Sequence, residues 1–229
     1  MAEAHDIIEE AKGALAVIDG KIRSHPAAVA VATGEAEQSA LQFFCGNQYQ
    51  MWKPNADARS VAMFRFAEHP YSAVFLTPPE IEDHAAQAFS ALGQCVGLKD
   101  PDGFEPSAGA FGYAAYKAWL ICYASAAEIA CARALNLAAW GHNCALMSSG
   151  LRSHYGLRPA DTAFLDGFSA LPAQEKSAAD VIEHDLKRGV DPRLILRAAR
   201  MMQAYELMFW DAMAEAGGIG ASQSKPDLL

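Results

Sequence analysis

The stretch AADVIEHDLKRGVDPRLILRAARMMQAYELMFWDAM, residues 178–213, decides the fold class. Its apolar residues recur at steps of three and four, a spacing that places them on one face of an α-helix. Gly189 is typical of a helix end. Asp191-Pro192 is typical of a helix start, because the aspartate can cap the first turn and the proline needs no N–H there. The stretch therefore predicts two helices, over about 173–188 and about 191–216.

The same periodicity continues through the rest of the chain and predicts a bundle. His25-Pro26 and His69-Pro70 predict helix ends, because the residue before a proline is driven out of the helical region. Further helices are expected over about 7–24, 35–52, 54–68, 80–96, 110–123, 125–154 and 161–170. No strand-like alternation, repeat or long linker interrupts them. We therefore expect an all-α bundle of eight or nine helices, with a single domain over 1–217 and a flexible tail over 218–229.

Composition excludes several function classes. The chain is 52% hydrophobic and carries a formal net charge of −9, with no basic stripe of the kind that binds nucleic acid. The most apolar stretch, 118–137, contains Glu128 and Arg133, which are costly inside a bilayer, so no membrane span is expected. The start of the chain lacks the pattern of a secretory signal. The five cysteines form no CxxC pair, which favours free thiols in a reducing cytoplasm.

Two more stretches carry a family resemblance together with the first. They are SHPAAVAVATGEAEQSALQFFCGNQYQMW, residues 24–52, and YAAYKAWLICYASAAEIACARALNLAAW, residues 113–140. The chain resembles the TenA/thiaminase II and PqqC-like group, and its most specific element is Tyr205-Glu206-x-x-Phe209-Trp210. The resemblance implies a heme-oxygenase-like bundle, a homodimer, and hydrolysis of thiamin-like compounds or of aminopyrimidines. It also implies a cysteine nucleophile, a C-terminal glutamate, a carboxylate near the second helix and several tyrosines.

Glu206 matches the catalytic glutamate of that family. Apolar and aromatic side chains surround it on its helix, among them Phe209 and Trp210, so the carboxyl group must find donors or raise its pKa. That property suits general acid–base chemistry, although a carboxylate tied to a donor in the core would show the same pattern. Tyr113 and Tyr116 match the paired tyrosines of the fifth helix. They are candidates for ligand binding, and the alternative is that both are ordinary core aromatics.

The family's nucleophile is missing at its expected position. The alignment places Asn136 there, and an amide cannot attack carbon as a thiolate does. Cys144 lies two turns later and is an alternative nucleophile, or else a small buried side chain. Asn47 and Gln48 replace the aspartate of the second helix, where amides can still recognise a ring nitrogen or an amino group. The remaining candidates for an aromatic box are Trp140, Phe168 and Trp210.

Metal binding is an alternative that the sequence leaves open. Glu80 with His84, and Asp180 with His184, have the i, i+4 spacing that places two ligands on one helix face. Related diiron oxygenases use such residues, but Asn136 stands where their central glutamate belongs, and solvated helix faces explain both pairs. Heme would require a proximal histidine, and His25 precedes a proline. We therefore expect neither a metal nor a cofactor.

Three functions follow in order of preference. The first is a TenA-like enzyme that binds a small nitrogen heterocycle and hydrolyses it with Glu206 as acid–base group and water as nucleophile. The second is a non-catalytic ligand-binding relative, and the third is a diiron oxygenase. The first two require that Glu206 faces an enclosed cavity with aromatic walls.

Overall fold

Helices dominate the computed structural model, which describes residues 2–75 and 79–220, without the side chains at 2, 53, 55, 56 and 79–82. The described residues form nine α-helices and one 3-10 helix and include no strand, so the all-α prediction is confirmed. In chain order the elements are α1 (Ala2–Arg23), α2 (Pro26–Thr33), α3 (Gln38–Arg65), η1 (Ser72–Phe75), α4 (Pro79–Cys95), α5 (Ala108–Tyr123), α6 (Ala126–His154), α7 (Ala163–Ser169), α8 (Glu175–Leu186) and α9 (Pro192–Ala216).

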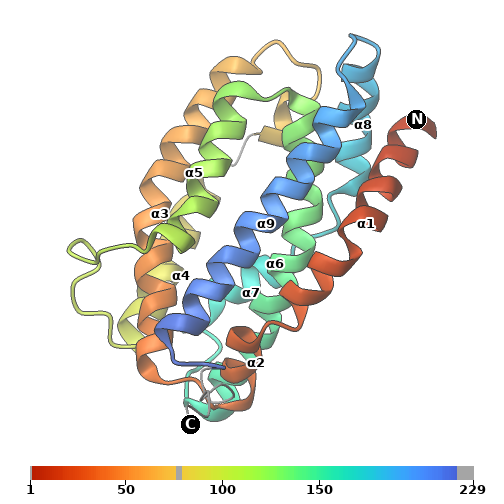
Figure 1. Ribbon diagram of the computed structural model, residues 1–229. Coiled ribbons are helices and arrows are strands. Elements are labelled where there is room, and N and C mark those ends of the chain that lie inside the picture. The colour runs from red at the N-terminus through yellow and green to blue at the C-terminus, as the bar shows by residue number, and fades with distance from the viewer. Residues whose placement is uncertain (1, 76–78, 221–229) are drawn as a thin grey trace.

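The long helices run side by side, with α9 between α5 and α1 (Figure 1). Helix α9 packs most closely on α5 and α6, and α3 packs on α5. Helix α6 is buried along most of its length, because α2, α7, α8 and α9 all lie against it. Side chains that point inward from α3, α5, α6 and α9 are therefore brought together in the interior of the bundle.

Polar residues at the predicted helix starts form the expected caps. The hydroxyl of Ser125 accepts the N–H of Glu128, whose carboxylate accepts the N–H of Ser125, which completes a capping box for α6. Ser107 caps α5, and Asp191 caps α9 ahead of Pro192. These caps fix where the helices that carry the candidate site begin.

The two His-Pro breaks share one hydrogen-bonding arrangement. In His25 and in His69, Nδ1 accepts the backbone N–H two residues later, at 3.2 Å. Nε2 of His25 lies 3.1 Å from Asp211, and Nε2 of His69 lies 3.1 Å from Asp185. Because Nδ1 is an acceptor, Nε2 must carry the ring proton and donate it to the aspartate. Each histidine thus ties the segment that follows a helix to a distant element, His25 at the start of α2 and His69 in the turn after α3.

The second and third predicted helices are wrong in their bounds. Instead of a break before Pro54, a single helix α3 runs from Gln38 to Arg65 with the proline inside it, and the short α2 precedes it. Pro54 removes one N–H from the helical ladder, but its side chain is exposed, so its ring does not disturb the packed face. Tertiary packing on both sides of the proline keeps the helix continuous.

Gly150 allows α2 and α6 to touch through their backbones. A Cβ atom built at this position would lie 2.2 Å from the carbonyl oxygen of Val31 and 2.5 Å from Cα of Ala32. Any larger residue would force the two helices apart. Among the described residues, no helix is both long enough and apolar enough to cross a membrane.

Candidate functional site

A buried network of hydrogen bonds joins α5, α6 and α9 around Glu206. The amide nitrogen of Asn136 donates to Oε2 of Glu206 at 2.5 Å and to Oε1 of Gln203 at 3.0 Å. The hydroxyl of Tyr113 donates to Oδ1 of Asn136 at 2.6 Å, and Nε1 of Trp210 donates to Oε1 of Glu206 at 3.2 Å. Glu206, Gln203 and Trp210 have no exposed surface. Asn136, at the position where the resemblance expects the cysteine, is thus the centre of the network.

Burial decides the charge of this network. It raises the pKa of Glu206 to about 8, against the opposing effect of the hydrogen bond from Trp210. Burial, followed by the proximity of Glu206, also raises the pKa of Tyr113 well above its ordinary value. At neutral pH the carboxyl group is therefore mostly protonated. The protonated form can donate a proton and the ionised form can accept one, and a pKa of about 8 makes both forms accessible near neutral pH, as a general acid–base group requires.

A row of aromatic rings extends from the network towards α3. Tyr113 stacks on Trp140 with ring centroids 6.0 Å apart, and Trp140 meets the edge of Phe168 at 6.1 Å. Phe168 contacts Phe164 at 5.2 Å, and Phe164 contacts Trp52 at 6.3 Å. This row joins side chains of α5, α6, α7 and α3, and rings of this kind suit a flat heterocyclic ligand.

The predicted site residues divide into two groups. Tyr113, Asn136, Trp140, Phe168, Glu206 and Trp210 all lie in the network or in the aromatic row. Gln48 lies on α3, and its buried Nε2 has no hydrogen-bond partner in the structure. A buried donor without a partner is uncommon in native proteins, which marks Gln48 as available to a ligand.

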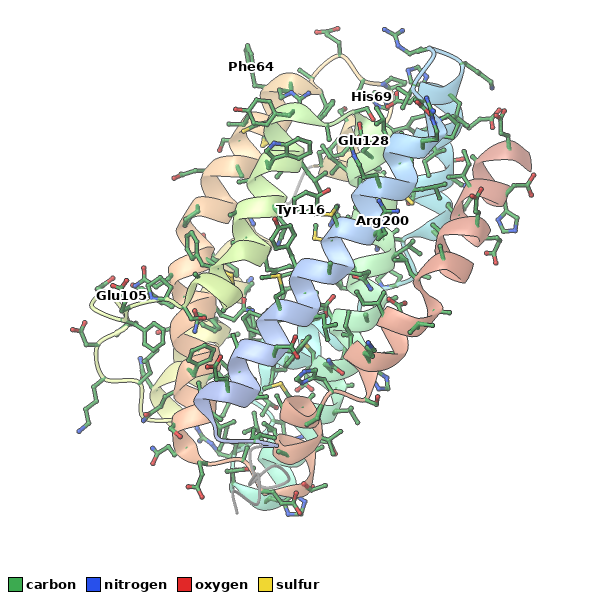
Figure 2. The ribbon with its side chains drawn as sticks, viewed as in Figure 1. Phe64, His69, Glu105, Tyr116, Glu128 and Arg200 are labelled. Atoms are coloured by element: carbon green, nitrogen blue, oxygen red, sulfur yellow. The ribbon has the colours of Figure 1, made fainter. Side chains whose placement is uncertain are left out.

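Asn47 and Tyr116 lie outside this group. Asn47 is fully buried, and its oxygen accepts the N–H of Ser107 at 3.0 Å, so it holds the start of α5 in place. Tyr116 stacks on Tyr205 at 5.0 Å and on Trp119 at 5.8 Å. In Figure 2 it lies between α5 and α9, where it lines a shallow groove of about 390 Å³ on the outer face.

Glu206 is fully buried, and its oxygens are already occupied by donors. Two depressions lie on the surface of the described residues outside the network, and Glu206 lines neither of them. One is the groove beside Tyr116, and the other lies by Ser107, Ala212 and Glu215. An enclosed cavity beside Glu206 stays a prediction.

Cys144 is buried and unpaired. Burial raises the pKa of its thiol well above the ordinary value, and the nearby Glu206 adds to that increase. The thiol is therefore held in its protonated form, which is a poor nucleophile. This environment favours the interpretation of Cys144 as a small buried side chain.

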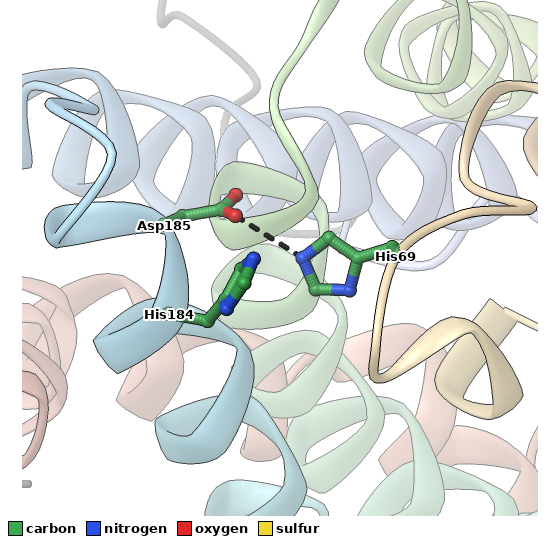
Figure 3. A group of neighbouring side chains, drawn as sticks. All are labelled: His69, His184 and Asp185. Carbon is green, nitrogen blue, oxygen red and sulfur yellow. Dashed lines mark hydrogen bonds and ion pairs between the residues drawn. The ribbon is translucent and has the colours of Figure 1, made fainter.

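His69, His184 and Asp185 form a cluster that deserves a test as a metal centre (Figure 3). One ligand atom of each lies within 4.8 Å of the others. A metal ion bound to Nε2 of His69 would need Nδ1 to carry the proton, and Nδ1 instead accepts the N–H of Tyr71 at 3.2 Å. The second oxygen of Asp185 accepts the N–H of Ala127 at 2.9 Å. The arrangement suits a structural His–Asp pair and does not suit a metal ion.

The i, i+4 pairs proposed as iron ligands do not come together in the described residues. Asp180 forms an ion pair with Lys176 at 3.1 Å, whereas its proposed partner His184 lies beside His69 with ring centroids 4.8 Å apart. His84 is exposed, and the side chain of Glu80 lies outside the described residues. A dinuclear iron site therefore gains no support from the side chains that can be placed.

Sequence reasoning missed Gln203, Trp52 and Phe164. Gln203 lies one turn before Glu206 and shares its helix face, so its spacing was the available signal. Trp52 and Phe164 lie on α3 and α7, and only the fold brings them beside Trp140 and Phe168.

Comparison with known proteins identifies the family. The sequence profile described as the TENA/THI-4/PQQC family matches residues 13–216. This chain belongs to the TENA/THI-4/PQQC family. No match was found among curated proteins.

Solved structures share the fold of this TENA/THI-4/PQQC family member at low sequence identity. A TenA homolog from Pseudomonas syringae superposes with a TM-score of 0.77 at 11% identity, covering 90% of this chain and 92% of that one. The TenA homologue from P. horikoshii OT3 has a TM-score of 0.69 at 15% identity, with 92% and 99% covered. A domain of unknown function with a heme oxygenase-like fold from Shewanella denitrificans has a TM-score of 0.71 at 13% identity, with 96% and 97% covered. The predicted heme-oxygenase-like fold is therefore confirmed.

Proposed function

We propose that this protein binds a small nitrogen heterocycle of the aminopyrimidine type in the interior of the bundle. The observation that carries the proposal is the buried network in which Asn136 joins Tyr113 to Glu206, beside the stacked rings of Tyr113 and Trp140. A flat ring would lie against these aromatic side chains. Its nitrogen atoms would exchange hydrogen bonds with the amide, the phenol and the carboxyl group.

Hydrolysis is a second candidate function, and the pKa of Glu206 favours it. A carboxyl group whose pKa is about 8 can deliver a proton to a leaving group and recover it near neutral pH. With Asn136 in place of a thiol, water would be the nucleophile, and Glu206 would be its acid–base partner.

One experiment separates the two functions. Calorimetry with an aminopyrimidine and with thiamin would measure binding, and chromatography of the same mixtures would measure product release. Binding without product supports a binding protein, whereas release that Glu206→Gln abolishes supports a hydrolase. Failure of the wild-type protein to bind either compound would sink both candidates. Glu105→Gln, at an exposed position outside the network, is the matched control and should change neither binding nor product release.

Compartment and assembly complete the proposal. All five cysteines are unpaired, which agrees with a reducing compartment such as the cytoplasm. We further propose a homodimer, and we propose neither nucleic acid nor a membrane as a partner.

A further inference from the structure

A chain of hydrogen bonds leads from the buried network to the surface of the molecule at α1. It begins at Asp19, a half-buried residue of α1, whose Oδ1 accepts a hydrogen bond from Nε2 of Gln203. Oε1 of Gln203 accepts from Nδ2 of Asn136 at 3.0 Å, and Oδ1 of Asn136 accepts from the hydroxyl of Tyr113 at 2.6 Å. Gln203 is fully buried, and Asn136 is 3% exposed. Asp19 is therefore the end of the chain that lies at the surface.

The carboxylate of Asp19 sets the direction of the hydrogen bonds along this chain. A carboxylate offers only acceptors, whereas an amide has one end that donates and one end that accepts. Gln203 must therefore turn its NH2 group towards Asp19 and its oxygen towards Asn136. Asn136 must in turn present its NH2 group to Gln203 and its carbonyl oxygen to Tyr113. In the reverse orientation the oxygen of Gln203 would face the carboxylate of Asp19, and neither side could donate.

The carbonyl oxygen of Asn136 is the atom through which this direction affects a ligand. Tyr113 donates to that oxygen and also stacks on Trp140, so a ring bound in the aromatic row would compete with the hydroxyl of Tyr113. A ligand in that place must donate to Oδ1 of Asn136 and accept from the released hydroxyl beside it. An amino group next to a ring nitrogen provides this pair. A carbonyl next to a ring N–H provides the opposite pair and places two oxygens against each other.

We propose that Asp19, acting through Gln203, makes the interior site select an amino-substituted nitrogen heterocycle over its oxo analogue. Asp19 is a positioning residue, because it contacts Gln203 and takes no part in the ligand contacts. The inference rests on the proposed function and adds to it the residue that determines specificity. The bond that Asp19 accepts is charge-assisted and is therefore stronger than a bond between two neutral amides.

Calorimetry with a matched pair of ligands tests this selection. 4-Aminopyrimidine presents an amino group beside a ring nitrogen, and pyrimidin-4-one presents a carbonyl beside a ring N–H. We expect the wild-type protein to bind the amino compound about tenfold more tightly or better, because the oxo compound leaves one buried pair mismatched. Asp19→Asn should bring the two affinities to within about threefold, because asparagine can face Gln203 with its oxygen or with its NH2 group.

An exchange of the two side chains provides a second test, which needs no ligand. In Gln203→Glu two carboxylates face each other. When Asp19→Asn is added, the asparagine donates to the glutamate, whose other oxygen still accepts from Asn136. Asp19→Asn should therefore lower the urea midpoint of unfolding in the wild-type background and raise it in the Gln203→Glu background. The double variant should also recover the preference for the amino compound.

Asp6→Asn removes the same charge from an exposed position of α1 and is the matched control. It should keep the wild-type preference and change the midpoint equally in both backgrounds. The proposal is overturned if Asp19→Asn keeps the wild-type preference, or if its effect on the midpoint has the same sign in both backgrounds. Equal binding of the two compounds by the wild type would also overturn it and would leave the proposed function standing. Binding of neither compound would overturn the proposed function and the selection together, and the midpoints would still show whether Asp19 orients Gln203.

Discussion

Glu206 is a carboxyl group held inside the bundle by neutral donors. The amide of Asn136 and the indole of Trp210 satisfy its oxygens without compensating a full negative charge, so burial favours the protonated form. Folding at neutral pH therefore takes up a proton at this position, which makes the stability of the protein depend on pH.

The first prediction concerns that dependence. The pKa of Glu206 is raised from 4.5 to about 8, so the folded state binds the proton more tightly than the unfolded state does. The contribution of Glu206 to stability is greatest below pH 4.5 and is lost as the pH rises to about 8, at up to about 1.4 kcal/mol per pH unit. Urea unfolding at several pH values should show this loss in the wild type.

The stability of Glu206→Gln should not fall in this way as the pH rises. The variant should still lose about 1 kcal/mol at every pH, because the NH2 group of glutamine would face one of the two donors that the carboxyl group now accepts. Glu105→Gln, at an exposed position, should keep the slope of the wild type. A Glu206→Gln variant that shares the wild-type slope would show that this carboxyl group is ionised in the folded protein.

The second prediction concerns Asn136. Asn136→Ala removes three hydrogen bonds and leaves buried groups of Tyr113, Gln203 and Glu206 without that partner. We expect a loss of about 3 kcal/mol or more in the free energy of unfolding. Asn143→Ala is the matched control, because Asn143 is also fully buried on α6 and donates one hydrogen bond, to Ile22. If urea unfolding shows a larger loss in the free energy of unfolding for Asn143→Ala than for Asn136→Ala, the network does not stabilise the fold as predicted.

Part of the candidate site could be read from the sequence. Glu206 stood out because a carboxyl group on an apolar helix face needs a special environment, and the resemblance supplied Tyr113, Asn136 and Trp140. Trp52 and Phe164 could not be singled out, because each is equally compatible with an ordinary core aromatic. Their places in the aromatic row depend on how α3 and α7 pack in the bundle, which no single helix encodes.

At the level of helices, the backbone contact of α2 with α6 gives the third prediction. Gly150→Ala places a methyl group against the backbone at Val31 and Ala32, which cannot move aside as a flexible side chain can. We expect a loss of about 2 kcal/mol or more in the free energy of unfolding.

Gly13→Ala is the matched control for that change, because Gly13 lies inside α1 and a Cβ there meets nothing within 4 Å. It should leave stability unchanged or raise it by about 0.5–1 kcal/mol, through helix propensity. Equal melting temperatures for the two variants would contradict the prediction, because they would show that α2 and α6 can move apart at Gly150 without loss of stability.

Helix positions were predictable where apolar spacing and caps agreed. The start of α9 at Pro192 and the start of α6 at Ala126 follow from Asp191 and Ser125, whose caps are local. The break expected before Pro54 does not occur, because the packing of a long helix compensates for one missing hydrogen bond. Local signals thus located the helix ends well, except where contacts with the rest of the bundle override them.

For the whole molecule, the exposed aromatic surface bears on assembly. Trp119 and Tyr123 are 43% and 72% exposed, their ring centroids lie 5.7 Å apart, and Trp119 also stacks beside Tyr116. We predict that a second copy of the chain covers this surface in the homodimer. Sedimentation velocity should show a dimer for the wild type and a shift towards monomer for Trp119→Glu.

Val17→Glu alters a side chain that is 75% exposed on α1 and should leave the dimer intact. A monomeric wild-type protein would contradict the prediction.

The saturation of Asn136 also bears on which ligands the proposed interior site could bind. Its two N–H groups and its carbonyl are already matched to Gln203, Glu206 and Tyr113. A ligand could bind to Asn136 only by replacing one of these partners with a donor or acceptor of its own. A hydrocarbon of the same shape would leave each displaced polar group without a hydrogen bond, at a cost of about 1–3 kcal/mol per group. The exchange of hydrogen bonds would therefore determine the selectivity of the site. Molecules of the right shape that lack donors and acceptors would not bind.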